Sequence, residues 1–251
     1  MTSNIWAALL LTTLAGLSTT FGALLGISNA KPGPRTMSAT LGFAAGVMLF
    51  VSFVELLKAS TDGIGFLLGN AAFFLGIAVM FVIDVLIPHE YFSEHYAGSS
   101  KLFRTGVLVA LGIGIHNFPE GLATFAGTLK SLRLGGAIAF AIAVHNIPEG
   151  LAVAVPILAA TGSRRKAFLF SFYSGMAEPL GAVVAALVLY RILNDVLLGW
   201  LLGIVAGLMV YVSLDVLVPA SREYGHDHVA IASAAGGMGL MSLSLWLFKL
   251  L

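Results

Sequence analysis

Two apolar runs of the chain carry nearly the same hexapeptide, His116-Asn117-Phe118-Pro119-Glu120-Gly121 in the first and His145-Asn146-Ile147-Pro148-Glu149-Gly150 in the second. Most of the residues on either side of each motif are Ala, Val, Leu, Ile and Gly. An ionisable side chain at mid-membrane costs about 2.5 to 3.5 kcal/mol, so such groups normally face one another, a cavity or an ion. The repeated motifs therefore bear on both the fold class and the chemistry of the chain.

The composition is that of an integral membrane protein. Of the 251 residues, 59% are hydrophobic and only 10% are charged, whereas soluble domains carry about 25% charged residues. The net charge of +1 gives no basic surface for nucleic acid. Because the chain contains no cysteine, disulfides, thiolate metal sites and cysteine nucleophiles are excluded. Any metal must be bound through nitrogen and oxygen.

Apolar stretches long enough to cross a bilayer follow one another with short polar gaps. They predict an all-α integral membrane protein with a single transmembrane domain over residues 1–251. The long apolar stretch that follows Asn4 predicts a retained first helix and no cleaved signal. The eight expected spans lie near residues 5–29, 37–57, 64–88, 105–129, 134–160, 165–190, 196–219 and 230–250.

The distribution of Lys and Arg predicts the orientation. The connections after the first, third, fifth and seventh spans hold eight of the 13 basic residues: Lys31, Arg35, Lys101, Arg104, Arg164, Arg165, Lys166 and Arg222. Basic loops are retained in the cytoplasm. Both termini are therefore expected on the extracytoplasmic side of a plasma membrane, which in a bacterium is the inner membrane.

Within each hexapeptide the His, Asn and Glu side chains share one helix face, because His and Glu are four residues apart and Asn and Glu are three apart. The internal proline removes a backbone hydrogen bond and loosens the helix. Because consecutive spans run in opposite directions, His116 is expected level with Glu149, and His145 level with Glu120. One metal ion between the helices can then bind two imidazoles and two carboxylates.

A further carboxylate, Glu178, lies in the middle of the sixth span and is also followed by a proline. We therefore expect two adjacent metal sites. One consists of His116, Glu120, His145 and Glu149, and the other of Asn117, Asn146 and Glu178, with Glu120 and Glu149 bridging. Imidazole and carboxylate ligands suit zinc and other first-row ions better than calcium or magnesium. A satisfied helix-packing network is the alternative, and it fits a single buried pair better than five such groups.

On these residues the chain resembles the ZIP family of divalent metal transporters, and most closely its bacterial ZupT-type members. The likeness covers the two HNxPEG motifs, Glu178 and the stretch 41–46 of the second span. The resemblance implies import of zinc, with Fe²⁺, Mn²⁺, Co²⁺ and Cd²⁺ as further substrates and no organic cofactor. It also implies inverted three-helix repeats around the fourth and fifth spans, a binuclear site between those spans, and a homodimer.

Other functions fit the residues less well. An enzyme is not expected, because HExxH and an evident serine or cysteine nucleophile motif are absent. A proton-coupled exchanger or exporter of the same ions remains the alternative, since buried Glu and His also carry protons.

Several outlying polar groups allow two interpretations. Glu55, expected at the outer end of the second span, either attracts a cation or simply meets water at a helix end, and we favour water. Asp84 with His89, Glu90, Glu94 and His95 forms either an exit relay or part of a solvated loop, as does the segment 226–228. Asp215, near the inner end of the seventh span, stays ambiguous.

Overall fold

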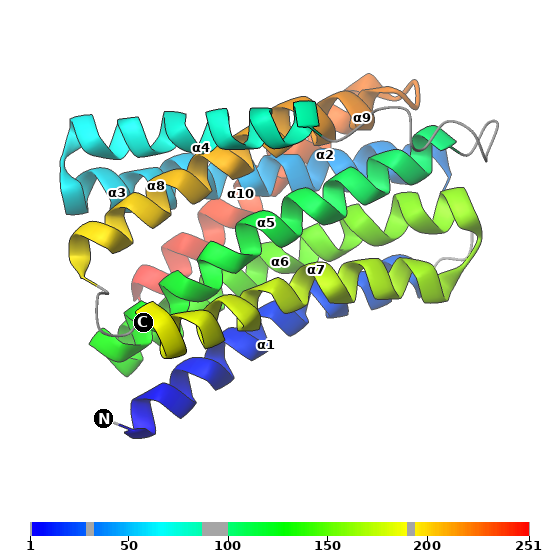
Figure 1. Cartoon of the computed structure of the whole chain (residues 1–251). Helices are drawn as coiled ribbons and strands as arrows, with labels where there is room; N and C mark the ends of the chain where they lie inside the picture. Colours follow the sequence, from blue (N-terminus) through cyan, green and yellow to red (C-terminus); the bar gives the residue numbers. More distant parts are fainter. Residues whose placement is uncertain (1, 29–32, 87–99, 190–193, 251) are drawn as a thin grey trace.

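The computed structural model describes residues 2–28, 33–86, 100–189 and 194–250 (Figure 1). In this part of the chain all regular structure is helical. The α-helices are α1 (Thr2–Ser28), α2 (Pro34–Val51), α3 (Leu57–Ile64), α4 (Phe66–Leu86), α5 (Ser100–Lys130), α6 (Leu132–Thr161), α7 (Arg164–Val184), α8 (Asp195–Val212), α9 (Val218–Arg222) and α10 (Asp227–Leu250). Three π-helical turns join or extend them: η1 (Ser52–Leu56), η2 (Ala185–Leu189) and η3 (Ser213–Leu217).

The eight expected spans are confirmed. Eight helical segments are long and apolar enough to cross a membrane: Asn4–Ser28, Pro34–Ile64, Phe66–Leu86, Gly106–Lys130, Ile138–Thr161, Arg164–Val188, Asp195–Arg222 and Asp227–Leu247. They lie side by side in one bundle (Figure 1). The helices run through Pro119 and Pro148 without interruption.

The second and seventh spans differ from the prediction, because each continues through a π turn. The second ends at Ile64 rather than near residue 57, and the seventh ends at Arg222. A π turn widens the helix and disturbs its hydrogen-bond ladder. Ser52 and Ser213 each begin such a turn, and their hydroxyls donate to the carbonyls of Met48 and Met209, both at 2.7 Å. Glu55 therefore lies inside a span, and the expectation that it lies at a helix end is wrong.

The packing places α5 and α6 at the centre. The two helices contact each other, α1 packs on α6, and α7 packs on α5. Farther out, α2 packs on α10 and α4 on α8 (Figure 1). By their order in the chain the other helices form two triads of spans, and the contacts of α2 with α10 and of α4 with α8 join one triad to the other. The first triad runs from α1 to α4, and the second from α7 to α10.

The two triads are inverted repeats. A Cβ added at Gly22 of α1 would lie 2.0 Å from the carbonyl oxygen of Ile147, and one at Gly181 of α7 would lie 2.0 Å from that of Phe118. Each triad thus meets one HNxPEG motif through the same close contact. Residues 41–60 (LGFAAGVMLFVSFVELLKAS) also match residues 202–221 (LGIVAGLMVYVSLDVLVPAS) in register. Because the first and sixth spans run in opposite directions, one repeat is inverted relative to the other.

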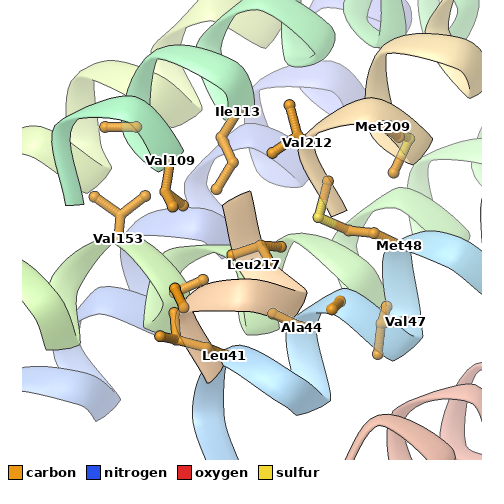
Figure 2. Close-up of a cluster of buried hydrophobic side chains, with 14 of the residues drawn as sticks. Leu41, Ala44, Val47, Met48, Val109, Ile113, Val153, Met209, Val212 and Leu217 are labelled. Carbon is orange, nitrogen blue, oxygen red and sulfur yellow. The ribbon is translucent and has the colours of Figure 1, made fainter. Parts of the chain in front are cut away.

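A buried apolar cluster fills the space between α2, α5, α8 and η3 (Figure 2). Leu41, Ile113 and Leu217 are fully buried there, together with Val109 and Val212. Figure 2 shows these side chains pointing toward one another from different helices. This cluster closes one end of the bundle beside the central motifs.

Candidate metal centre

Two glycines bring the flanking helices close to the centre. A Cβ on Gly121 would lie 1.9 Å from the carbonyl oxygen of Glu178, and a Cβ on Gly150 would lie 1.9 Å from that of Thr19. Real Cβ atoms do not approach oxygen so closely, so both positions require glycine, which has no Cβ. The last residue of each hexapeptide therefore allows α7 to cross α5, and α1 to cross α6. The crossing of α7 places Glu178 beside the motif helices.

The imidazoles and carboxylates of α5 and α6 form two cross-helix pairs. His116 Nε2 lies 3.1 Å from Glu149 Oε1, and His145 Nε2 lies 3.3 Å from Glu120 Oε2. All four residues are at most 1% exposed. These are the pairs that the antiparallel arrangement predicts.

The two asparagines are held through their amide nitrogens. Asn146 Nδ2 donates to Glu178 Oε2 at 2.8 Å and to the carbonyl oxygen of Ala15 at 3.0 Å. Asn117 Nδ2 donates to the carbonyl oxygen of Ser174 at 3.3 Å. Because the nitrogens are engaged with α1 and α7, the amide oxygens remain available to a ligand.

Five buried oxygen atoms around this centre accept no hydrogen bond from the described part of the chain. They are Oε1 of Glu120, Oε2 of Glu149, Oε1 of Glu178, and Oδ1 of Asn117 and of Asn146. Buried polar atoms are nearly always hydrogen-bonded, and each exception calls for an explanation such as an ion. The carboxylate and amide oxygens of this centre suit a cation, because a cation interacts favourably with several oxygens at once.

The residues are not arranged as a ready-made metal site. Within the described ranges, no group of three His, Asp or Glu side chains is placed to hold a metal ion as it stands. The two imidazoles and two carboxylates on α5 and α6 instead contact each other in pairs. A metal ion bound here would replace these hydrogen bonds and displace any proton shared within each pair. The metal role of the seven predicted residues therefore stays a prediction.

A cavity of about 390 Å³ reaches this centre from one end of the bundle. Glu120 and His145 line its inner part, while Gly63, Lys130 and Asp195 come from helix ends and line its mouth. Lys130 Nζ lies 3.0 Å from Asp195 Oδ1. The walls between are mainly apolar residues of η1, α3, α6 and α8, with Val51 at the end of α2.

The sequence and its relatives give the family. The model of the ZIP zinc transporter family matches residues 90–245. The chain is 44% identical to zinc transporter ZupT of Clostridium perfringens, over 98% of this chain and 97% of the relative. It is 46% identical to ZupT of Streptococcus mutans, over 99% of this chain and 100% of the relative. The chain belongs to the ZIP zinc transporter family. A third relative, ZupT of Chlorobium phaeovibrioides, is 47% identical over 98% of this chain and 99% of its own length. All three of these ZupT relatives are named as zinc transporters.

The outlying polar groups do not join the centre. Asp84 accepts a hydrogen bond from Tyr211 at 3.3 Å, and Asp215 is exposed in η3. His226 and His228 are exposed at the start of α10, as expected of a solvated connection. The predicted groups His89, Glu90, Glu94 and His95 lie outside the described residues.

Thr19 is a buried polar residue of the centre that the sequence analysis missed. It occupies in α1 the place that Glu178 occupies in α7, and its Oγ1 has no hydrogen-bond partner in the described residues. The signal was present in the spacing of Gly16, Thr19 and Gly22, which matches that of Gly175, Glu178 and Gly181. The two halves of the centre therefore differ by one carboxylate.

Proposed function

We propose that this chain imports divalent transition-metal ions, chiefly Zn²⁺, through a binuclear centre between α5 and α6. The observation that carries the proposal is the set of five buried oxygens beside two His–Glu pairs. The names of the relatives, which are zinc transporters, support zinc as the main cargo. Fe²⁺, Mn²⁺, Co²⁺ and Cd²⁺ fit the same ligand types and are proposed as further substrates.

In this proposal His116, Glu120, His145 and Glu149 hold one ion. Asn117, Asn146 and Glu178 hold the second, with Glu120 and Glu149 shared between the two positions. Sharing supports release, because two cations a few ångströms apart repel each other and neither is held too tightly. The bond from Asn146 to Glu178 holds that carboxylate in place before the metal arrives.

In the transport step, an entering metal ion replaces the hydrogen bonds between the paired His and Glu side chains with bonds to the metal. An ion in the cavity meets Glu120 and His145, loses water, and replaces the contact between these two side chains. It then moves toward the His116–Glu149 pair on the other side of the centre. Rocking of one helix group against the other opens the opposite end, as in transporters built from inverted repeats.

The proposal also includes the orientation of the chain in the membrane and its assembly with a second copy. We propose that both termini lie outside a plasma membrane, and the distribution of Lys and Arg supports this orientation. The mouth of the cavity, at Gly63, Lys130 and Asp195, is then extracytoplasmic. We also propose that the chain forms a homodimer, as the family resemblance implies.

Zinc uptake into proteoliposomes tests the function. Glu149→Ala removes a carboxylate that neither ion can do without, so uptake should fall to the background of empty liposomes. The control Glu223→Ala removes an exposed carboxylate outside the centre and should transport as the parent does. Unchanged uptake by a folded Glu149→Ala protein would rule out the proposed centre.

A second measurement separates the binuclear centre from a single site. Equilibrium binding of Cd²⁺ should give one ion fewer per chain for Glu178→Gln than for the parent, since Glu178 contributes only to the second position. Equal numbers of bound ions in the two proteins would rule out the second site. Repeating uptake under imposed pH gradients of either sign distinguishes the alternative: a proton-coupled exchanger responds to the sign of the gradient, whereas a simple importer follows the zinc gradient.

A further inference from the structure

The cavity has a polar residue in its wall that the proposed centre does not use. One face of the second span lines it over its whole depth, through Val51, Glu55, Ala59 and Gly63. From Glu55 to Gly63 these residues recur every four positions, which is the spacing of one face of an α-helix. Glu55 is therefore the carboxylate that this span places inside the cavity.

Glu55 is exposed, and along its helix it lies well inside the mouth of the cavity that it lines. It is eight residues from Gly63, or about 12 Å along a helix, and Glu120 is ten residues from Lys130, or about 15 Å. Both Gly63 and Lys130 line the mouth, so the two carboxylates lie at nearly the same depth. A cation that travels to the centre must pass between these walls.

The other repeat has no carboxylate at the corresponding place. The register of residues 41–60 on 202–221 aligns Glu55 with Val216. Asp215 precedes Val216 in η3, and it is not among the residues that line the cavity. Glu55 is thus not required by the repeated fold, since the second copy of the same π turn forms with Val at this position.

A second observation points to a cation here. Oε1 of Glu120, in a residue 1% exposed, accepts no hydrogen bond from the described chain, and Glu120 lines this cavity. At the mouth, Lys130 and Asp195 form an ion pair, so their charges largely cancel. Apolar walls strengthen the field of the carboxylates inside the cavity. Two carboxylates match the charge of one divalent ion.

We propose that Glu55 and Glu120 form a third cation-binding position, in which a partly hydrated divalent metal ion is held before it passes to His145. This inference rests on the proposed function and adds an entry site to it. The position is specific to one end of the pathway, because the opposite repeat carries Val216. It speeds capture of dilute metal without making release at the other end slower.

Uptake kinetics test the entry site. Glu55→Gln keeps the size of the side chain and removes its charge, so the KM for zinc should rise about tenfold, as expected for loss of one charge-assisted contact. The maximal rate should change less than twofold. The control Asp215→Asn removes the acidic residue of the other π turn and should leave both constants unchanged. An unchanged KM for Glu55→Gln would overturn the proposal.

A cysteine in the cavity gives a readout that does not need transport. The chain has no cysteine, so Glu55→Cys carries one thiol, which a membrane-impermeant maleimide should label. Cd²⁺ should protect this thiol, and adding Glu120→Gln should weaken the protection at least tenfold. Ala59→Cys, one turn nearer the mouth, should be labelled with little protection. Equal protection of both thiols would overturn the proposal. If the parent protein takes up no zinc, the proposed function is contradicted. The thiol-protection experiment still tests the entry site in that case, because it does not depend on transport.

Discussion

The two ends of the bundle are built from the same repeated unit and are packed differently. At one end, Val51, Leu56 and Ala59 line the cavity together with Leu202. The inverted repeat relates these four residues to Val212, Leu217, Ala220 and Leu41, which are all at most 6% exposed in the apolar cluster (Figure 2). Val51 and Leu56 also belong to that buried cluster, so the difference between the two ends is clearest at Ala59, which lines the cavity and is half-buried, and at Ala220, which is packed in the cluster. The difference shows that this sequence unit can support both arrangements.

This comparison gives the structure a place in a transport cycle. The centre is reached from the mouth at Lys130 and Asp195, while the apolar cluster blocks the other end. If the repeats exchange their packing, the cluster opens and the cavity closes. The His–Glu pairs lie between the two ends, where either arrangement can reach them. Alternating access by inverted repeats requires this kind of placement.

The largest effect is expected from alanine substitutions at the two glycine contacts where the repeats pack on the central helices. Gly121→Ala and Gly150→Ala each place a Cβ within 1.9 Å of a backbone oxygen, so a flanking helix must move away. Overpacking of this kind costs about 1–3 kcal/mol or more. We expect both variants to lose uptake, and each melting temperature to fall by about 5 °C or more. Detergent melting curves and proteoliposome uptake measure the two effects.

The same helices supply matched controls. A Cβ on Gly136 of α6 meets nothing within 4 Å, and one on Gly114 of α5 meets only ordinary contacts. Gly114→Ala and Gly136→Ala should therefore leave uptake and melting temperature close to those of the parent. If Gly121→Ala were harmless and Gly150→Ala were damaging, the two triads would not dock in the same way.

A smaller effect would sharpen the comparison of the open and closed ends. Ala59 and Ala220 occupy equivalent positions, one lining the cavity and one 6% exposed in the packed cluster. Ala59→Cys should react with an impermeant maleimide at least about tenfold faster than Ala220→Cys, since a minor conformation is populated at 10% or less. Labelling of sealed vesicles of both orientations, without metal, gives the two rates. Equal rates would mean that the two ends do not differ in solution.

Much of the fold was accessible from the sequence, because lipid leaves few alternatives to apolar helices. The eight spans follow from composition and length, and the cross-helix pairs follow from spacing and the reversal of direction between consecutive spans. The π turns that begin at Ser52 and Ser213 could not be predicted from hydropathy, because hydropathy does not distinguish a π turn from the α-helix that it extends. Without them, the prediction placed Glu55 at a helix end.

The candidate centre was accessible only in part. Its charged residues are conspicuous because they are costly in lipid, and the repeated motif identifies them. The acceptors that hold the asparagine amide groups are the backbone carbonyl oxygens of Ala15 and Ser174, which have no signature in the sequence. Thr19 is also inconspicuous, since its significance comes from its relation to Glu178 through the inverted repeat. Packing geometry, rather than residue type, determined what was missed.

The smallest expected effect concerns the ion pair at the mouth, a feature that belongs to the open end. Lys130 and Asp195 are 61% and 75% exposed, so breaking their pair should hardly change stability. Their separate charges should act on the entering metal with opposite signs. A unit charge about 12 Å from a dication in water changes its free energy by about 0.7 kcal/mol, which is a factor of about three in affinity.

At low ionic strength, Lys130→Ala should lower the KM for zinc by up to that factor, and Asp195→Asn should raise it. Both shifts should vanish at about 0.15 M salt, where the screening length is about 8 Å. Shifts of equal sign, or shifts that persist in salt, would mean that the pair acts by holding the mouth together rather than by its field.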